Sequence, residues 1–322
     1  MSSTGFYRAF EERFYAPRSM IKELRKQYLP FIEPLRQLYP GAASFDIGCG
    51  RGEWLELMLE HGFNPFGMDL DEGMLQAARE LKLPALQGDA VAHLRSLSDE
   101  SMAVISAFHV VEHITFEQLR TVITESKRVL MPGGLLIMET PNPENIVVAT
   151  RNFYLDPTHI RPIPPMLLQY IADYEGYARS RVVRLQERPD LRTATDIRII
   201  DILSGVSPDY AVVAQKSIDS AMALNFDAPF NAEYGVNLDA LCMRYESFKE
   251  EKISSLVEMK GVTAELVRHS QDLLRRVSEL DMNQKSLLEK MHELEGRHDA
   301  LLKSSSWRIT APLRKILSIF SK

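Results

Sequence analysis

The chain has 322 residues, of which 45% are hydrophobic, a length and content that allow one catalytic domain with an extension. The formal net charge of −6 argues against a general nucleic-acid binder, which would need a basic face. The two cysteines, Cys49 and Cys242, cannot form a disulfide framework or a metal cluster, so we expect no metal site.

The first 40 residues have a helical pattern. Apolar side chains recur at helical spacing from about Phe6 to Leu38, which predicts one or two amphipathic helices before the first strand. The residues that carry this spacing are Phe6, Phe10, Phe14, Ile21, Leu24 and Tyr28.

A glycine-rich turn follows the first apolar strand. The strand ends at Asp46, and Gly48, Gly50 and Gly52 follow at alternate positions. Such glycines let the backbone turn sharply into a helix and approach a ligand closely. The dinucleotide fingerprint G-x-G-x-x-G has a wider last spacing. The pattern D-x-G-x-G-x-G instead resembles the first motif of class I S-adenosylmethionine-dependent methyltransferases.

Two further motifs match that family in order. The segment from Asn64 to Leu70 is predicted to be a strand that ends in Asp69, where the family places a carboxylate on the ribose hydroxyls. The segment from Leu86 to Ala90 resembles the family's adenine-binding turn. There the resemblance implies that Asp89 accepts from the exocyclic amine.

The next two motifs continue the match. The predicted strand from Met102 to Phe108 runs into His109-Val-Val-Glu-His113, which resembles the loop below the methyl donor. A helix end, a Pro-Gly-Gly turn and a fifth strand follow between Val129 and Met138, a common signature of the family. The strands from Ala178 to Leu185 and from Asp209 to Gln215 then complete the sheet.

The resemblance implies an α/β fold: a doubly wound, seven-stranded, Rossmann-like sheet over residues 41–217, with residues 1–40 as a helical lid. It implies S-adenosyl-L-methionine as the cofactor. Arg18 in the lid would either meet the methionine carboxylate of this cofactor or lie on a solvated face. The residues expected to bind the cofactor are Asp46, Gly48, Cys49, Gly50, Gly52, Asp69, Leu70, Asp89, Ala90 and His109. For Cys49 we expect the size rather than the thiol to matter.

A long polar loop after the fifth strand is the expected acceptor site, because prolines between positions 141 and 165 disfavour regular structure there. An alcohol acceptor needs a base, and the candidates are His113, Asp156 and His159. Histidine is the side chain whose unperturbed pKa lies near neutrality, which makes His159 attractive as the base, and Asp156 three residues earlier can orient it. Equally, the turn can be structural, with Asp156 bonding backbone amides and His159 bonding a carbonyl. For His109 and His113, packing on adenosine is the alternative to proton transfer.

The C-terminal third differs in composition. We interpret residues 218–237 as a linker and residues 238–303 as a coiled coil, because leucine recurs every seven residues. The pattern predicts homo-oligomerisation; the alternative is a helix that packs back on the catalytic domain. The leucines, taken as d positions, are Leu266, Leu273, Leu280, Leu287, Leu294 and Leu301.

Residues 304–322 form a basic amphipathic C-terminal segment without acidic residues. Trp307, Leu313 and Ile316 would form an apolar face with Leu317 and Phe320, opposite Arg314 and Lys315. Such a segment fits a membrane surface or a partner protein; the alternative is a cap on the coiled coil. No apolar run approaches 18 residues and no signal-like segment opens the sequence, so we expect a cytoplasmic protein, peripheral at the inner face of the cytoplasmic membrane.

The whole pattern resembles bacterial surface-polysaccharide (O-antigen, WbdD-like) chain-terminating methyltransferases. That resemblance implies O-methylation of a sugar hydroxyl at the non-reducing end of a lipid-linked glycan and a polymerase glycosyltransferase as partner. The segment from Ser304 to Arg314 also resembles tails of polysaccharide-assembly glycosyltransferases. Two alternatives stay open: a small-molecule, quinone-type O-methyltransferase, and a methyltransferase-fold scaffold in a polysaccharide assembly complex.

Overall fold

The computed structural model describes residues 16–317 and divides into two units, one ending at Phe248 and one beginning at Lys249. The helical pattern predicted for Phe6 to Tyr15 lies outside the described residues, as does Phe320. Each unit is described by itself.

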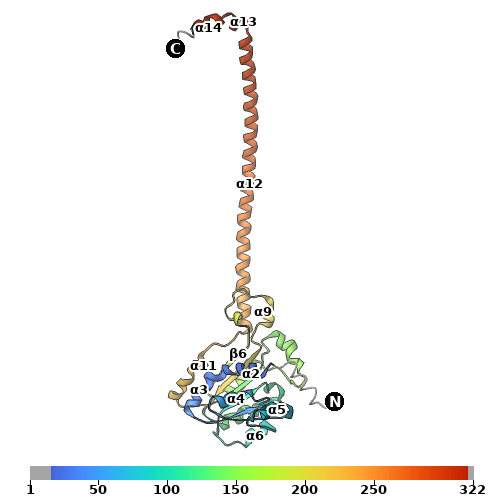
Figure 1. Ribbon diagram of the computed structural model, residues 1–322, viewed down its shortest axis with the longest axis vertical. Coiled ribbons are helices and arrows are strands. Elements are labelled where there is room, and N and C mark those ends of the chain that lie inside the picture. The colour runs from blue at the N-terminus through green and yellow to red at the C-terminus, as the bar shows by residue number, and fades with distance from the viewer. Residues whose placement is uncertain (1–15, 318–322) are drawn as a thin grey trace. The chain divides into compact units, whose positions relative to one another are not determined.

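A seven-stranded sheet forms the centre of the first unit, in the order β3-β2-β1-β4-β5-β7-β6. Figure 1 shows helices of this unit around its strands. Strands β1 to β5 pair in parallel, and β7 is antiparallel to both β5 and β6. The predicted doubly wound methyltransferase sheet is therefore confirmed. The strands are β1 (Ala43–Ile47), β2 (Asn64–Asp69), β3 (Ala85–Gln87), β4 (Met102–Phe108), β5 (Leu130–Pro141), β6 (Arg179–Leu185) and β7 (Asp209–Gln215).

Helices cover both faces of the sheet because successive strands carry apolar side chains toward both. On one face α3 and α4 bury Phe31, Trp54 and Leu57. On the other, α6, α7 and α8 bury Leu94, Ile123 and further apolar side chains. The helices of the first unit are α2 (Arg18–Arg25), α3 (Leu29–Leu38), α4 (Glu53–Glu60), α5 (Glu72–Glu80), α6 (Ala90–Ser96), α7 (Phe116–Val129), α8 (Pro165–Tyr174), α9 (Ile199–Ser204), α10 (Ser220–Ala223) and α11 (Asp227–Asn231).

Single-turn helices lie in the connections between these elements. The polar loop after β5 contains two of them, so it is less irregular than its prolines suggested. The single turns are η1 (Lys26–Tyr28), η2 (Val111–His113), η3 (Val148–Asn152), η4 (Phe153–Leu155), η5 (Pro189–Arg192) and η6 (Leu224–Phe226).

The segment expected to be a linker instead folds onto the sheet. Phe226 and Phe230 are buried in the same core as Phe31, and the Phe31 and Phe230 rings meet edge to face with centroids 5.3 Å apart. Val236 and Leu241 join a smaller core with Leu191. The first unit therefore extends past residue 217, because these apolar side chains complete its core.

Helix α2 is tied to the sheet by a buried ion pair. The Arg25 guanidinium contacts the Glu139 carboxylate at the end of β5, and the Tyr28 hydroxyl donates to the same carboxylate. Burial alone would raise the pKa of Glu139, but Arg25 and His109 overcome that effect and hold it at about 2. Glu139 is therefore the counter-charge of the buried Arg25 and of the half-buried His109.

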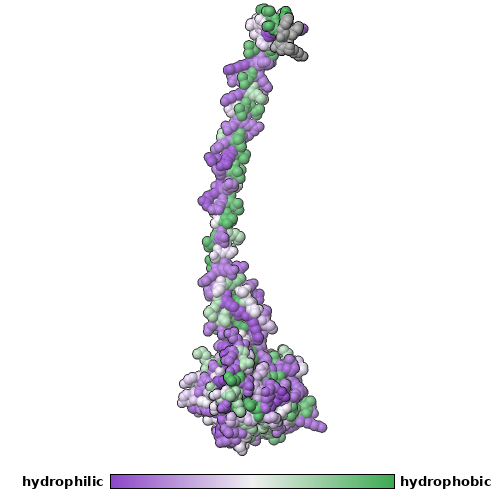
Figure 2. All heavy atoms as spheres, turned by 90° about the vertical axis from the view of Figure 1, so that its left-hand side faces the viewer, coloured by the Kyte–Doolittle hydropathy of each residue, from purple (hydrophilic) through white to green (hydrophobic). Residues whose placement is uncertain are grey.

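Helix α12 (Leu238–Lys303) is a single helix of 66 residues, about 100 Å long. It begins in the first unit, and from Lys249 onward it makes up most of the second unit. The helix is confirmed over the predicted range, whereas its coiled-coil pairing stays a prediction. Apolar side chains follow the helix among polar ones in the space-filling view (Figure 2). All side chains of this helix from Lys249 onward are exposed except Asp272, which is half-buried.

Two short helices, α13 (Ser305–Ile309) and α14 (Ala311–Leu317), end the described chain. The Arg314 guanidinium lies 3.6 Å from the centroid of the Trp307 ring and also donates to the Trp307 carbonyl. Arg314 is therefore not opposite Trp307, as the amphipathic pattern suggested, because the break at Thr310 brings the two together. Among the described residues, no helix combines the length and apolarity needed to cross a membrane.

We predict that Glu139→Gln lowers the free energy of unfolding at neutral pH by about 3–5 kcal/mol, because Arg25 and His109 would lose their buried counter-charge. The pKa of Glu139 is lowered from 4.5 to about 2, so its contribution is complete above pH 4.5 and is lost as the pH falls toward 2. The difference between wild type and variant should therefore shrink in acid. Chemical denaturation followed by Trp54 fluorescence measures it.

The matched control is Glu33→Gln, which removes an exposed pair with Arg36. It should leave stability almost unchanged at every pH. Equal effects of the two substitutions would contradict a special role for the buried pair.

Candidate active site

A cavity of about 920 Å³ opens at the carboxyl ends of the parallel strands. This is where open α/β sheets bind ligands, because the connecting loops meet there. Of the predicted site residues, only Gly52 is not part of the cavity wall. The others in the wall are Asp46, Gly48, Cys49, Gly50, Asp69, Leu70, Asp89, Ala90, His109, His113, Asp156 and His159.

The glycine turn needs its glycines for conformation. Gly48, Gly50 and Gly52 have φ angles of +68°, +50° and +76°, a region that other residues rarely adopt. A Cβ on Gly48 would lie 2.5 Å from Val110 Cγ2, and one on Gly52 would lie 2.7 Å from Leu83 Cδ1. Gly52 therefore shapes the start of α4 rather than the cavity wall.

Cys49 lies against a glycine that sequence reasoning left unassigned. A Cβ on Gly67 would lie 2.5 Å from the Cys49 Cβ, so the two backbones can approach only because Gly67 has no side chain. Burial raises the pKa of the Cys49 thiol, which keeps it neutral and unreactive. The packing supports the prediction that the size of Cys49 matters.

Asp69 connects β2 to the glycine turn. Its Oδ2 accepts from the Gly50 amide at 2.9 Å, and its Oδ1 accepts from the Asp71 amide at 2.8 Å. Burial raises the pKa of Asp69, against the effect of these hydrogen bonds. Each oxygen retains a lone pair, so the carboxylate can accept two hydroxyl groups from a ligand in the cavity.

Asp46 and Asp89 also line the cavity. Burial raises the pKa of Asp46 to about 7, against the hydrogen bond that Ser106 Oγ donates to it at 2.6 Å. Asp89 caps α6, since its Oδ1 accepts from the Val91 and Ala92 amides. The cap uses Oδ1 alone and leaves Oδ2 for a ligand donor.

His109 belongs to the buried ion cluster below the cavity. Its Nδ1 lies 3.3 Å from Glu112 Oε1, and its Nε2 lies 3.2 Å from Glu139 Oε1. Burial would lower the pKa of His109, but these carboxylates raise it well above the usual value. A charged imidazolium therefore forms this part of the wall, and its contact with adenosine stays a prediction.

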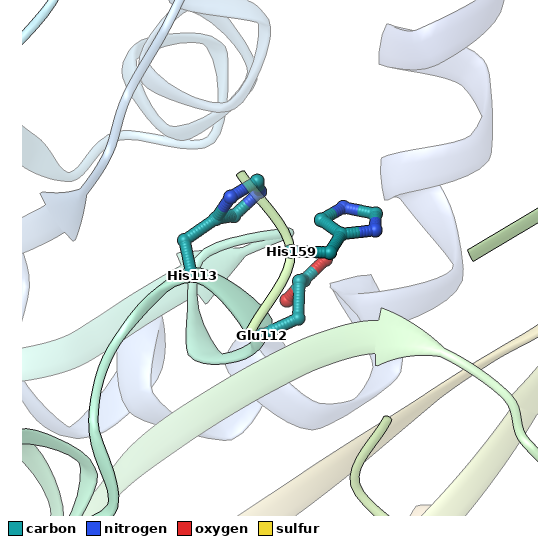
Figure 3. Close-up of side chains that lie close together, drawn as sticks. All are labelled: Glu112, His113 and His159. Atoms are coloured by element: carbon teal, nitrogen blue, oxygen red, sulfur yellow. The ribbon is translucent and has the colours of Figure 1, made fainter. Parts of the chain in front are cut away.

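The loop after η4 brings His159 beside His113 (Figure 3). The two rings meet edge to face with centroids 4.6 Å apart. His159 Nδ1 lies 2.6 Å from the Phe153 carbonyl, and His113 Nδ1 lies 2.8 Å from Thr158 Oγ1. A carbonyl can only accept, so His159 carries its proton on Nδ1 and presents the Nε2 lone pair.

Asp156 has a different contact from the one that its spacing suggested. Its Oδ1 accepts from the Thr158 amide at 2.8 Å, and its Oδ2 lies 3.9 Å from His159 Nε2. The Phe153 carbonyl, rather than Asp156, therefore orients the His159 ring. The turn therefore has the structural contacts that the sequence allowed: Asp156 with a backbone amide and His159 with a carbonyl. These contacts leave Nε2 of His159 able to accept a proton or bind a ligand.

A metal ion is an alternative ligand of the same cluster. Ligand atoms of Glu112, His113 and His159 lie within 4.8 Å of one another (Figure 3), and two imidazoles and a carboxylate suit a divalent cation. The sequence predicted no metal because only its cysteines were considered. A metal-bound Nε2 cannot accept a proton, so the two roles exclude each other.

Arg25, Glu139 and Glu53 also line the cavity and were not predicted. The burial of Arg25 could have been predicted from the sequence. Arg25 lies on the same helical face as Ile21 and Leu24, and a charge on a buried face needs a buried partner. Arg18, which was considered instead, is absent from the cavity wall and pairs with Glu56. Arg25, rather than Arg18, is therefore the cation that α2 places in the cavity wall.

Comparison with known proteins identifies the same region. A family described as "Methyltransferase domain" matches residues 45–138. The crystal structure of a SAM-dependent methyltransferase from Archaeoglobus fulgidus is similar with 30% identity and a TM-score of 0.57, covering 66% of this chain and all of that one.

Curated relatives match only in part. A probable S-adenosylmethionine-dependent methyltransferase of Mycolicibacterium smegmatis is 30% identical over 42% of this chain and 52% of its own length. A ubiquinone biosynthesis O-methyltransferase of Pseudomonas aeruginosa is 28% identical over 42% of this chain and 61% of its own length. The chain thus spans between half and two thirds of these relatives.

The cavity wall fits S-adenosylmethionine. Gly48 and Gly50 line the wall without side chains, Asp69 can accept from two ribose hydroxyls, and Asp89 Oδ2 can accept from an amine. The exposed Leu70 at the rim supplies an apolar surface for a purine.

We predict that Asp69→Asn weakens binding of S-adenosylmethionine and S-adenosylhomocysteine about ten- to a hundred-fold. Hydrogen bonds to a charged group are worth about 1.5–3 kcal/mol, and an amide offers only one acceptor atom. Isothermal titration measures the affinities. The matched control, Asp99→Asn, changes an exposed partner of Arg128 and should not alter them; unchanged affinity in Asp69→Asn would remove this residue from the site.

Proposed function

The chain belongs to the S-adenosylmethionine-dependent methyltransferases, and we propose that it is an O-methyltransferase that acts on a sugar hydroxyl at the non-reducing end of a bacterial surface polysaccharide, the O-antigen. Methylation of that hydroxyl would end chain extension. The observation that carries the O-methyl assignment is the presented Nε2 of His159 in the wall of the cofactor cavity.

When bound, the cofactor supplies an electrophilic methyl group on a sulfonium. Its transfer is an in-line displacement, so the protein mainly positions the acceptor behind the methyl group. Asp69 and Asp89 would hold the nucleoside end. The part of the wall that includes Asn152, Leu155 and His159 would then receive the acceptor.

His159 is the proposed general base. Its Nδ1–H is donated to the Phe153 carbonyl, which leaves Nε2 to take the proton of an acceptor hydroxyl. The carboxylate of Asp156, 3.9 Å from Nε2, would stabilise the imidazolium that results. Burial lowers the pKa of His113, against the effect of Glu112, and the neighbouring His159 lowers it further, so His113 would stay neutral beside the acceptor.

The polysaccharide assignment rests on the second unit. The matched methyltransferase region ends well before α12, and a cofactor site alone does not require a helix about 100 Å long. We propose that α12 spaces the active site from a polymerase glycosyltransferase. In this proposal α13 and α14 bind that partner or the inner face of the cytoplasmic membrane from the cytoplasm, through Trp307, Arg314 and Lys315.

A second candidate acceptor is a quinol-type small molecule. The ubiquinone biosynthesis O-methyltransferases of Pseudomonas aeruginosa and Idiomarina loihiensis are each 28% identical over 42% of this chain, which favours this candidate. It does not account for α12 and the basic tail.

Transfer of a radiolabelled methyl group from S-adenosylmethionine to two acceptors distinguishes the candidates. We predict incorporation into O-antigen glycan with a free non-reducing end and little into a catechol or quinol. Glycosidase trimming should release the label with the terminal sugar. Labelling of the quinol alone would support the second candidate.

We predict that His159→Ala lowers turnover about a hundred-fold or more, with cofactor affinity nearly intact, because it removes only the base. The exposed His292→Ala serves as the matched control and should behave as wild type. A chelator should not reduce wild-type activity, whereas added Zn²⁺ should inhibit by occupying Nε2. If a chelator abolishes activity and Zn²⁺ restores it, His159 is not the general base, and the cluster binds a cation instead. If His159→Ala loses its fold or its cofactor binding, the turn that contains His159 has a structural role.

A further inference from the structure

The second unit presents an apolar stripe that nothing in the described chain covers. The six leucines at d positions of α12 are at least half exposed. The next position, e, is also apolar in four of these heptads, at Val267, Leu274, Leu288 and Leu302. Exposed apolar side chains at this spacing follow one face of a helix, so the stripe is a surface for another helix.

The charged residues on the two sides of the apolar stripe differ in sign. The g positions carry only basic or neutral side chains: His269, Arg276, Asn283, Lys290 and Arg297. The charged e positions are both acidic, Asp281 and Glu295. The stripe therefore has a basic border and an acidic or apolar border.

This distribution of charge favours a second copy of the same helix, in parallel orientation, as the partner. In a parallel coiled coil, a g residue faces the e residue five positions later on the other helix. That geometry places Arg276 opposite Asp281 and Lys290 opposite Glu295, and each pair occurs twice in a dimer. In an antiparallel pair g faces g, so basic residues would oppose each other.

We propose that α12 binds α12 of a second copy of this chain, parallel and in register. The heptads supply the shared apolar seam, and the g-to-e pairs between copies set the orientation. Because neighbouring copies run in the same direction, their catalytic units lie at the same end of the assembly. This inference does not depend on the identity of the methyl acceptor.

The ion pairs within one helix are compatible with this assembly. Arg276 contacts Asp272 at 3.0 Å, and Asp281 contacts Lys285 at 3.3 Å. These partners are on the outer surface, and Arg276 remains 67% exposed. Such exposed contacts are weak, so the side chains can turn toward a second copy.

The test uses two charge-reversed forms of the full chain. One is Arg276→Glu with Lys290→Glu, and the other is Asp281→Lys with Glu295→Lys. Each should self-associate at least about ten-fold more weakly than wild type in sedimentation equilibrium, because four attractive pairs become repulsive. Mixed one to one, the two forms should associate with near wild-type affinity, since opposite charges then meet again.

The matched control is Arg268→Glu with Arg275→Glu, at the outer f position. It changes the net charge by the same amount as the first form, and we expect no loss of self-association. Unchanged affinity for S-adenosylhomocysteine in every variant shows that the catalytic unit is folded. A monomeric wild type, as expected for a helix packed on its own domain, would overturn the proposal. Self-association of both forms equal to that of wild type would also overturn it, because in an antiparallel pair, where g faces g, like charges oppose each other before and after the reversal.

Discussion

The contact between the glycine turn and the end of β2 determines the shape of the active site. The Gly48 and Cys49 amides donate to the Met68 carbonyl, and the Gly50 amide donates to Asp69. These bonds form only because the turn adopts left-handed angles and Gly67 leaves room for Cys49. The same contact starts α4, opens the cavity and fixes the carboxylate that is expected to hold the ribose.

The second constraint is the charge buried below the cavity. Arg25 from α2, His109 from the loop after β4, and the carboxylates of Glu112 and Glu139 neutralise one another, and all of them except the half-buried His109 are buried. A lone buried charge would be costly, so the four groups must assemble together. Helix α2 and two strand ends are thereby held in place around the cofactor cavity, and the loop that carries His159 lies beside Glu112.

Local patterns allowed most of the fold to be predicted, because glycine turns and alternating strands and helices are encoded within short segments. The strands at 179–185 and 209–215 agree with prediction to within one residue. Contacts between distant segments were harder. Neither the role of Arg25 nor the burial of Phe226 and Phe230 is visible in a short window, because each depends on a partner far away in the sequence. The orientation of His159 by the Phe153 carbonyl likewise depends on the fold of a loop.

A crystal structure of the complex with S-adenosylhomocysteine would show how the cavity holds the cofactor. We predict that both ribose hydroxyls contact Asp69, that adenine lies by Leu70 and Asp89, and that the sulfur faces the wall formed by His113 and His159. A nucleoside bound in the reverse direction, or bound away from Asp69, would contradict this prediction. So would a sulfur that faces away from His159, because no acceptor held by that histidine could then reach the methyl group.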